Sequence, residues 1–276
     1  MANLLRELAQ TTTIPPLVRA AVLGQVILAV AREVSVGSDL VKRIFIIGNG
    51  PSLREHDLDS LIGEETWALN RIHLIYGTTN WRPTRWWWTD HPQVSWQLRD
   101  IFEGVRREAN CWIRSDICEM LTGEYRPFGA EWSFYDSLPA SVHSWAYCNQ
   151  HLASRVSEPN WPKVYHWPPD GSLCKVGTGA SVMIAKAILE GYDRIYLLGC
   201  DAGFKPDLHH FDSEYLGGHE ALTPEYCEQV NARIVGAHTL LRNAAQSREV
   251  SIQNISSSDA LRDIYEYTTL PEALAQ

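Results

Sequence analysis

The sequence predicts an α/β domain with a Rossmann-like, doubly wound and mostly parallel sheet and an inserted lid or loop region. Residues 43–47 and 194–198 each carry an unbroken apolar run, which is typical of parallel strands that are covered on both faces. A helical pattern over residues 179–190 leads into the second run, and another begins at Pro224 after it. Strands and helices that alternate in this way form parallel sheets.

The remaining elements continue this alternation. Shorter strands are expected at residues 66–70, 85–89, 110–114, 163–167 and 250–255. We expect Thr178 to cap the helix at residues 179–190, Gly191 to end it in a left-handed conformation, and Thr223 to cap the helix that starts at Pro224. A separate helical pattern covers residues 17–34, so we divide the chain into an N-terminal helical segment, residues 1–40, and an α/β domain, residues 41–276.

The composition limits the classes of partner and compartment. The chain has 276 residues and a formal net charge of −9, so it would repel the phosphates of nucleic acids rather than bind them without specificity. Its 6 cysteines form no C-x-x-C pair, which favours reduced thiols and a cytoplasmic location. The most apolar stretch, residues 20–31, is shorter than the ~20 residues of a membrane span, so we expect no integral membrane contact.

A glycine-containing turn directly follows the first strand. Ligands of open α/β sheets bind beyond the carboxyl ends of the strands, where loops and helix starts meet. Glycine lets the backbone approach a ligand closely, and the amides of the next helix start can face an anion. The alternative is a tight strand-to-helix turn without a ligand, and glycines alone do not decide between the two. The turn consists of Gly48, Asn49, Gly50, Pro51 and Ser52.

A second helix start is built from small residues, namely Thr178, Gly179, Ala180 and Ser181. Its backbone amides could also face an anion or a sugar. Taken alone, it is more simply a capped helix whose small residues permit close packing. Two such helix starts in one α/β chain favour a site for a dinucleotide or a nucleotide sugar.

These two blocks resemble one family of enzymes. The string from Ile46 to Leu53, Ile-Ile-Gly-Asn-Gly-Pro-Ser-Leu, is similar to the opening motif of the family 42 sialyltransferases and of related bacterial, archaeal and phage proteins grouped with flagellin-modification and pterin-diphosphokinase-like proteins. The second block, residues 178–181 with residues 191–201, resembles the same group in order and spacing. Asn70 and Asp90 fall near two further donor-contacting positions. The resemblance spans residues 43–258, and only the two blocks are specific.

The resemblance implies a glycosyltransferase that uses a nucleotide sugar as co-substrate and needs neither a metal ion nor another cofactor. Donor contacts would come from both blocks and from the ends of two strands: Gly48, Asn49, Gly50, Pro51, Ser52, Asn70, Asp90, Thr178, Gly179, Ala180 and Ser181. In the sialyltransferases a tyrosine that stabilises the leaving phosphate stands where this chain has Gly203. Lys205, Tyr215 or a loop histidine is a candidate substitute, and the donor need not be a CMP-sugar.

The loop after Asp201 holds the candidate catalytic residues His209, His210 and His219. The resemblance implies that a histidine of this loop is the general base, and an imidazole that titrates near neutrality suits that role. We take His210 as the base, oriented by Asp207, Asp212 or Glu214, with Asp201 as a further catalytic candidate. Two other interpretations stay open: a zinc or manganese site built from these histidines with Asp201 or Asp212, and a solvated polar loop.

Three alternative functions also stay open. The first is an ATP- and magnesium-dependent phosphotransferase of the pterin-diphosphokinase type, with Asp90 and Asp201 as metal ligands. The second is a phage-type glycosyltransferase that modifies a DNA base, and the third is a nucleotide binder without turnover. The hydroxyl acceptor would be a glycan or, less simply, a modified nucleobase, and a homo-oligomer is not excluded.

All 11 tryptophans lie between Trp67 and Trp167, and we expect most of them to pack in the core and one or two to line an acceptor groove.

Overall fold

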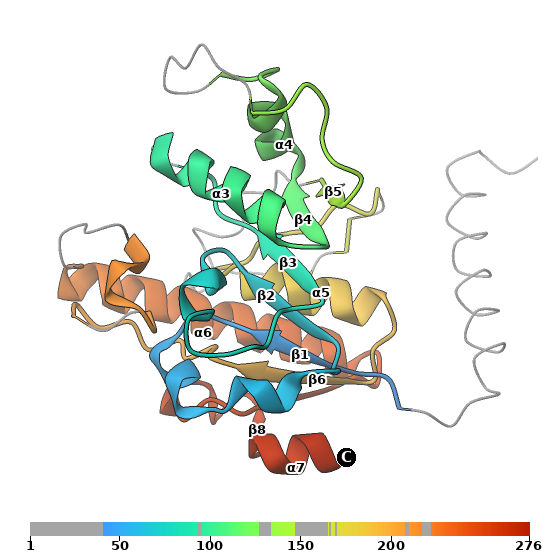
Figure 1. Cartoon of the computed structure of the whole chain (residues 1–276). Coiled ribbons are helices and arrows are strands. Elements are labelled where there is room, and N and C mark those ends of the chain that lie inside the picture. The colour runs from blue at the N-terminus through green and yellow to red at the C-terminus, as the bar shows by residue number, and fades with distance from the viewer. Residues whose placement is uncertain are drawn as a thin grey trace, which may run out of the picture. The chain divides into compact units, whose positions relative to one another are not determined.

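An eight-stranded, all-parallel sheet in the order β5-β4-β3-β2-β1-β6-β7-β8 forms the centre of the protein (Figure 1). The computed structural model describes residues 41–92, 95–126, 134–146, 165, 167–168, 170–207, 210–216 and 222–276. Lys42–Gln276 forms one compact unit. The N-terminal helical segment predicted for residues 1–40 lies outside the described residues. The predicted doubly wound α/β class is confirmed.

Strands and helices alternate along the chain, and six of the eight strands and two of the α-helices lie where the sequence predicts them. The strands are β1 Arg43–Ile47, β2 Thr66–Leu69, β3 Arg85–Trp88, β4 Cys111–Arg114, β5 Val142–Trp145, β6 Arg194–Leu198, β7 Ser251–Asn254 and β8 Glu266–Tyr267. The α-helices are α3 Ser95–Arg107, α4 Ser115–Thr122, α5 Ala180–Leu189, α6 Pro224–Gln246 and α7 Leu270–Ala275. Short 3-10 helices are η1 Pro51–Glu55, η2 Leu58–Leu61, η3 Ile72–Ile75, η5 Ser213–Leu216 and η6 Asp259–Leu261.

The strand order reverses at the centre of the sheet. β1 pairs with β2 on one side and with β6 on the other, and the chain between β2 and β5 moves outward from β1 while β7 and β8 extend the opposite half. The connections leave the carboxyl ends of β1 and β6 in opposite directions. This is the place where doubly wound sheets leave room for a ligand.

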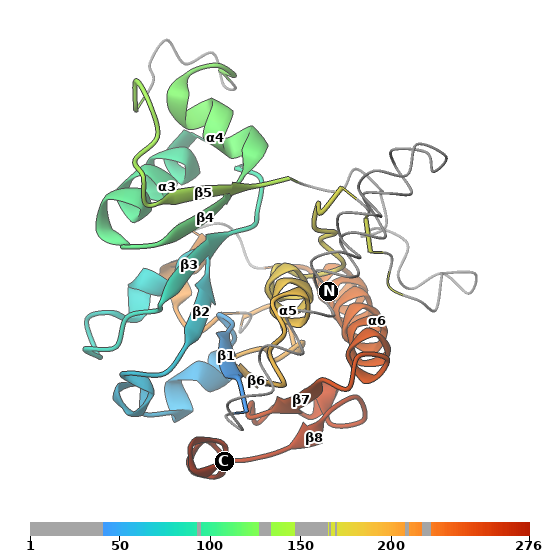
Figure 2. The ribbon, with the colours of Figure 1, turned by 90° about the vertical axis from the view of Figure 1, so that its right-hand side faces the viewer.

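Both faces of the sheet are covered, which explains the unbroken apolar runs. Ile44 and Ile46 of β1 pack with α5 and α6 on one face, where these two helices lie side by side (Figure 2). Phe45 and Ile47 point to the other face and pack with η1, η2, η3, α3, α4 and α7. Alternate side chains of a strand face opposite sides, so a strand between two helical layers is apolar at every position.

The tryptophans serve mainly to fill the two cores, as expected. Trp67, Trp81, Trp86, Trp87, Trp88 and Trp145 are buried. The Trp87 ring lies 4.9 Å from the ring of Trp112 in a stacked arrangement, and Trp67 adjoins it at 5.5 Å. Trp132 and Trp161 lie outside the described residues.

Two local expectations need correction, and several elements were not predicted. A strand was expected at residues 163–167, but the two of these residues that are described, Tyr165 and Trp167, are not in a strand, and β5 pairs with β4 instead. The middle of β5 is exposed, so its sequence lacks the apolar run by which the other strands are found. The helices α3, α4 and α7 and the strand β8 were also not predicted.

The second correction concerns one of the helix caps. Thr223 caps α6 as predicted, because its side chain accepts a hydrogen bond from Tyr226 N. Gly191 has the predicted positive φ of 73°. α5 begins at Ala180, so Gly179 and not Thr178 occupies the N-cap position, although Thr178 Oγ1 accepts from Ala180 N at 3.4 Å.

The cysteines and the surface are consistent with a core of reduced thiols and a mixed exterior. Five of the cysteines are buried and form no disulfide: Cys111, Cys118, Cys174, Cys200 and Cys227. Cys148 lies outside the described residues.

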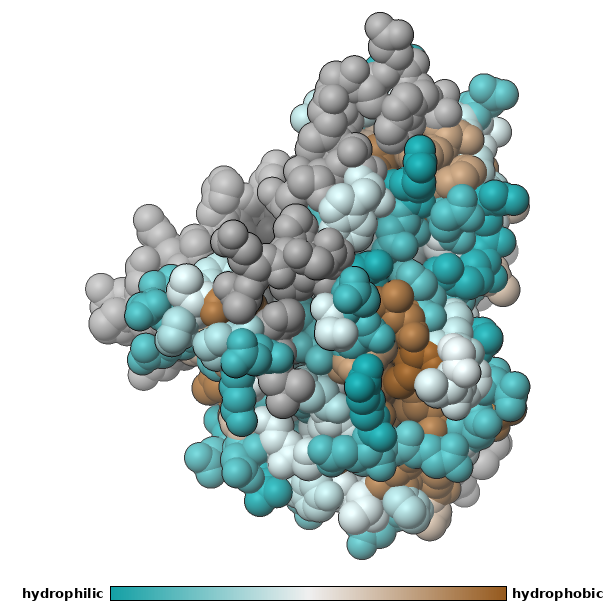
Figure 3. Space-filling model, turned by 60° about the vertical axis from the view of Figure 1, so that its left-hand side comes forward, coloured by the Kyte–Doolittle hydropathy of each residue, from teal (hydrophilic) through white to brown (hydrophobic). Residues whose placement is uncertain are grey.

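On the face shown in Figure 3, hydrophilic side chains surround a narrow apolar strip. Within the described ranges, no helix combines the length and the apolar character that crossing a membrane requires.

A buried histidine links α6 to the segment after η6. His238 is 1% exposed, and its Nδ1 lies 3.1 Å from the hydroxyl oxygen of Tyr265. The Tyr265 hydroxyl donates to the His238 carbonyl oxygen at 3.0 Å, so Nδ1 must carry the proton and donate to Tyr265. Burial lowers the pKa of His238 from 6.5 to about 4.

This pKa predicts acid sensitivity. The unfolded chain binds a proton at His238 near pH 6.5 and the folded protein only near pH 4, so stability is lost as the pH falls through this range. Between pH 7.5 and pH 5, His238 should cost the folded protein about 2 kcal/mol. Urea unfolding at both values measures the loss, and His238→Gln should show a correspondingly smaller one. Equal pH dependence in both proteins would contradict the assignment.

Candidate functional site

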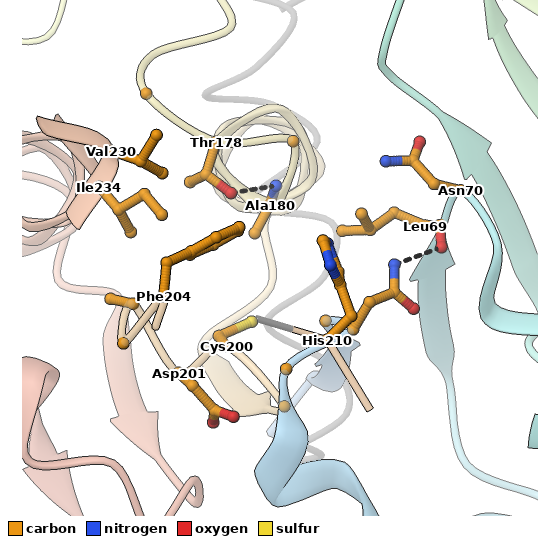
Figure 4. Close-up of a pocket in the computed structure, with 18 of the residues that line it drawn as sticks. Leu69, Asn70, Thr178, Ala180, Cys200, Asp201, Phe204, His210, Val230 and Ile234 are labelled. Atoms are coloured by element: carbon orange, nitrogen blue, oxygen red, sulfur yellow. Dashed lines mark hydrogen bonds between the residues drawn. The ribbon is translucent and has the colours of Figure 1, made fainter. Parts of the chain in front are cut away.

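A cavity of about 400 Å³ opens where the strand order reverses (Figure 4). Its walls are the turns after β1 and β6, the ends of β2 and β3, the start of α5 and one side of α6. The predicted site residues that line it are Gly48, Asn49, Gly50, Pro51, Asn70, Asp90, Thr178, Gly179, Ala180, Asp201 and His210. Ser52 and Ser181 are buried and are not among the residues that line it. His209 and His219 lie outside the described residues.

The glycines after β1 are needed for contact with β6. Gly48 N donates to Leu198 O at 2.7 Å, and Gly50 N donates to Gly199 O at 2.8 Å, so the two strands stay joined beyond their ends. A Cβ on Gly48 would collide with the carbonyl oxygen of Gly199. Protein packing therefore accounts for these glycines, and the close approach places both turns at the cavity.

Asp201 joins the same two turns through its side chain. Its carboxylate accepts hydrogen bonds from Ser52 N at 2.8 Å and from the Ser52 hydroxyl, and its carbonyl oxygen accepts from Ser258. Asp201 is 9% exposed. These contacts give Asp201 and Ser52 a positioning role, since they fix the start of η1 against the end of β6.

Asn49 presents an unsatisfied acceptor. Its Nδ2 donates to Leu69 O and to the Tyr215 hydroxyl, both at 2.9 Å, while Oδ1 is buried without a partner among the described residues. Leaving a buried acceptor unpaired costs about 1–3 kcal/mol. Because Asn49 lines the cavity and is only 6% exposed, Oδ1 is a buried acceptor in the cavity wall, and a donor that reached it would remove this cost.

The ends of β2 and β3 contribute a linked polar chain. Asn70 has a φ of 49°, and its Nδ2 donates to Asp90 Oδ2 at 2.6 Å. The other oxygen of Asp90 is paired with the ammonium of Lys175. Desolvation raises the pKa of Asp90, but the charge and the hydrogen bond of Lys175 are the main effects that outweigh it, so the pKa lies below its ordinary value. Lys175 was missed from the sequence because it belongs to no motif.

The start of α5 is held rigidly by Ser181. The Ser181 hydroxyl donates to Thr178 O at 2.6 Å and accepts from Val176 N at 2.9 Å. A Cβ on Gly179 would collide with the Thr89 hydroxyl, so only glycine lets the helix start reach the end of β3. The small residues of this block thus pack closely, and that packing brings the backbone of Thr178, Gly179 and Ala180 to the cavity.

His210 stands between two aromatic rings. It stacks on Tyr215 with 3.8 Å between ring centroids and 8° between planes, and it meets Phe204 edge-on at 5.4 Å. Arg71 holds this segment by donating to the carbonyl oxygens of Glu214, at 2.7 Å, and Tyr215. Burial and the nearby Asp90 carboxylate raise the pKa of Tyr215, so its phenol stays protonated near neutrality.

The side of the cavity formed by α6 is apolar, which the sequence did not reveal. Val230 and Ile234 of α6 lie close to the ring of Phe204, and the three side chains form this wall (Figure 4). Asn231 fixes Phe204 by accepting from its backbone N at 2.7 Å and donating to its O at 2.9 Å. The cavity therefore offers polar groups along the sheet and an apolar wall along α6.

Comparisons with known proteins give matches in structure alone. The chain matches no protein-family model and no sequence of a characterised protein. The monofunctional α-2,3-sialyltransferase Cst-I from Campylobacter jejuni is 15% identical, with a TM-score of 0.46 over 83% of this chain and 80% of its own. A single-residue variant of the sialyltransferase Cst-II, solved in complex with CMP, is 14% identical, with a TM-score of 0.46 over 83% of this chain and 87% of its own. Similarity this low assigns neither an activity nor a substrate to the chain.

The carboxylates at the cavity are already engaged. Both oxygens of Asp90 and both of Asp201 have protein partners, and the described residues include no group of at least three His, Cys, Asp or Glu side chains placed to hold a metal ion. A metal site that uses His209 or His219 involves residues outside the described part of the chain.

The contribution of the contact between Ser52 and Asp201 to the free energy of unfolding can be measured. Hydrogen bonds to charged groups contribute about 1.5–3 kcal/mol, so Ser52→Ala should lower the free energy of unfolding by about that amount. Urea denaturation checks this, with the exposed Ser60 changed to alanine as the control. If the two variants were equally stable, the joint between the two turns would be weaker than its geometry indicates.

Proposed function

We propose that this protein is a glycosyltransferase that moves a sugar from a nucleotide-sugar donor to a hydroxyl acceptor. The observation that carries the proposal is the composition of one cavity. A helix start, the unpaired oxygen of Asn49 and the imidazole of His210 meet there, at the point where the strand order of the sheet reverses. The proposed catalytic domain is residues 41–276 and the proposed compartment is the cytoplasm.

The donor would bind with its phosphate near the start of α5. The helix dipole favours an anion there. Asn49 Oδ1 would accept a hydrogen bond from a ribose hydroxyl or a base amino group. The apolar wall, with Phe204 and Ile234, would pack against the flat face of the base or the sugar ring. Gly48, Gly50, Pro51, Asn70, Thr178, Gly179 and Ala180 would complete the donor site.

His210 would act as the general base. It would take the proton from the acceptor hydroxyl while that oxygen forms a bond to the anomeric carbon of the donor sugar. The bond from this carbon to the phosphate oxygen breaks, and its electron pair leaves with the nucleotide. A positioned base of this kind contributes ~100- to 10,000-fold, and the rest of the rate would come from positioning and from stabilising the phosphate. The transfer as proposed needs no metal ion.

The motif resemblance makes a sialyltransferase-like reaction with a CMP-sugar the first specific case to test. A phosphotransferase that uses ATP and magnesium would need Asp90 and Asp201 as metal ligands. Asp201 is bound to Ser52, and Asp90 is bound to Asn70 and Lys175, so both would first have to leave their partners. The glycosyltransferase requires no such rearrangement.

A thermal-shift screen tests the donor site. CMP, UDP, GDP, dTDP and ATP are each added with and without magnesium or manganese. A ligand at 100 times its Kd stabilises the folded protein by ~2.7 kcal/mol, which gives a visible rise in Tm. We expect a metal-independent rise with one pyrimidine or guanine nucleotide. A rise with ATP and magnesium alone would favour the phosphotransferase, and no rise with any nucleotide would refute the donor site.

The role of His210 is tested by separating binding from turnover. His210→Ala should reduce acceptor-dependent nucleotide release by ~100- to 10,000-fold and leave nucleotide affinity nearly unchanged. The exposed His143 on β5, changed to alanine, is the control. His209→Ala and His219→Ala belong in the same series, because full activity in His210→Ala combined with loss in one of these would move the base to that residue.

A further inference from the structure

Lys175 lies on the cavity wall immediately before the turn that starts α5. Its side chain is 21% exposed, its ammonium is paired with Asp90, and Nζ lies 3.5 Å from Thr89 O. Among the described residues that line the cavity, the lysine and arginine side chains are Lys175 and Arg233. Lys175 thus places a basic side chain on the cavity wall, a few residues before the start of α5, where the helix dipole favours an anion.

The carboxylate that holds Lys175 is itself fixed to the sheet. Asp90 Oδ2 accepts from Asn70 Nδ2 at 2.6 Å, and Asn70 Oδ1 accepts from Thr89 N at 3.0 Å. The backbone of Asn70 is fixed by Trp87 O and by the indole N–H of Trp86, each at 2.7 Å. A flexible lysine normally loses side-chain entropy when it binds an anion, and this chain of contacts has already restricted it.

We propose that Lys175 binds the phosphate of the donor, with Asp90 as the residue that positions it when the cavity is empty. The proposal rests on the proposed function, which supplies the phosphate. An ammonium has three donors, so it can keep one on Asp90 and turn the others to phosphate oxygens. When the bond between sugar and phosphate breaks, negative charge grows on those oxygens, and a nearby ammonium stabilises it.

Electrostatics at the cavity require such a cation. Asp90 and Asp201 both line the cavity, and an unneutralised carboxylate would repel a phosphate. The Asp201 carboxylate accepts hydrogen bonds from Ser52, whereas the negative charge of Asp90 is paired with the ammonium of Lys175. Arg233 is the weaker candidate for binding the phosphate. Its Nε donates to Gln229 O of its own helix, and the contacts described for it include no carboxylate from the sheet that would orient its side chain.

The arrangement makes two variants change affinity in opposite directions. Lys175→Met removes the charge but keeps the length of the side chain, so it should weaken anion binding. Asp90→Asn removes the charge that competes for the ammonium, while the amide oxygen can still accept from Asn70. Asp90→Asn also releases Lys175 from its restricted position, but we expect the loss of a negative charge at contact distance to outweigh this entropic cost, so this variant should bind anions more tightly than the wild type.

Isothermal titration with inorganic pyrophosphate tests this without knowledge of the base. We expect Lys175→Met to raise the Kd about 10- to 100-fold, as for the loss of a charged hydrogen bond. Asp90→Asn should lower the Kd several-fold, and the double variant should resemble Lys175→Met. Arg233→Met should stay within twofold of the wild type, and the Tm of each free variant confirms folding.

Three results would overturn the proposal: no pyrophosphate binding by the wild type, unchanged affinity in Lys175→Met, or weaker binding in Asp90→Asn. If Lys175→Met fails to fold, the sign of the Asp90→Asn change still decides. The proposed function fails separately. Pyrophosphate binding through Lys175, in a protein that releases no nucleotide from any nucleotide sugar, would refute glycosyl transfer and leave the assignment of Lys175 in place.

Discussion

The close contact between the turns after β1 and β6 is the constraint on which the rest of the site depends. Backbone hydrogen bonds from Gly48 and Gly50 continue the pairing past the last strand residues, and a side chain at Gly48 has no room. Asp201 then joins the turns through Ser52. Because the connections leave these two strands in opposite directions, fixing their ends also fixes the floor of the cavity between them.

The walls of the cavity come from elements that approach this floor from different layers. The ends of β2 and β3 supply Asn70 and Asp90, and Gly179 lets the start of α5 reach the end of β3. α6 supplies the apolar wall and holds Phe204 through Asn231. The cavity thus combines a helix start, polar side chains along the sheet and an apolar wall, and these three features suit the phosphate, the hydroxyls and the flat base of the proposed nucleotide.

The sequence revealed those features that leave a local pattern. Strands covered on both faces are apolar throughout, so β1 and β6 were predicted closely, and the two glycine-containing blocks drew attention to the right ends of the sheet. β5 was missed because exposed residues interrupt its apolar pattern. Lys175 and Asn231 were also missed, because each acquires its role only from a partner far along the chain, Asp90 or Phe204. The glycines of the two blocks were predicted as ligand-binding residues. In the structure they are needed chiefly because the protein segments around them pack too closely for a side chain.

The net charge of the whole chain does not determine how the cavity treats an anion. A net charge of −9 would disfavour an anionic donor if it acted uniformly. At the cavity, however, Asp90 is paired with Lys175, and Asp201 keeps its charge but has its carboxylate turned to the hydrogen-bond donors of Ser52. Exposed charges farther away are screened over ~8–10 Å at physiological salt, whereas the groups at the cavity wall act at contact distance. The balance within the cavity, rather than the balance of the chain, therefore decides whether a phosphate can bind, and the pairing of Asp90 with Lys175 is the interaction that sets it.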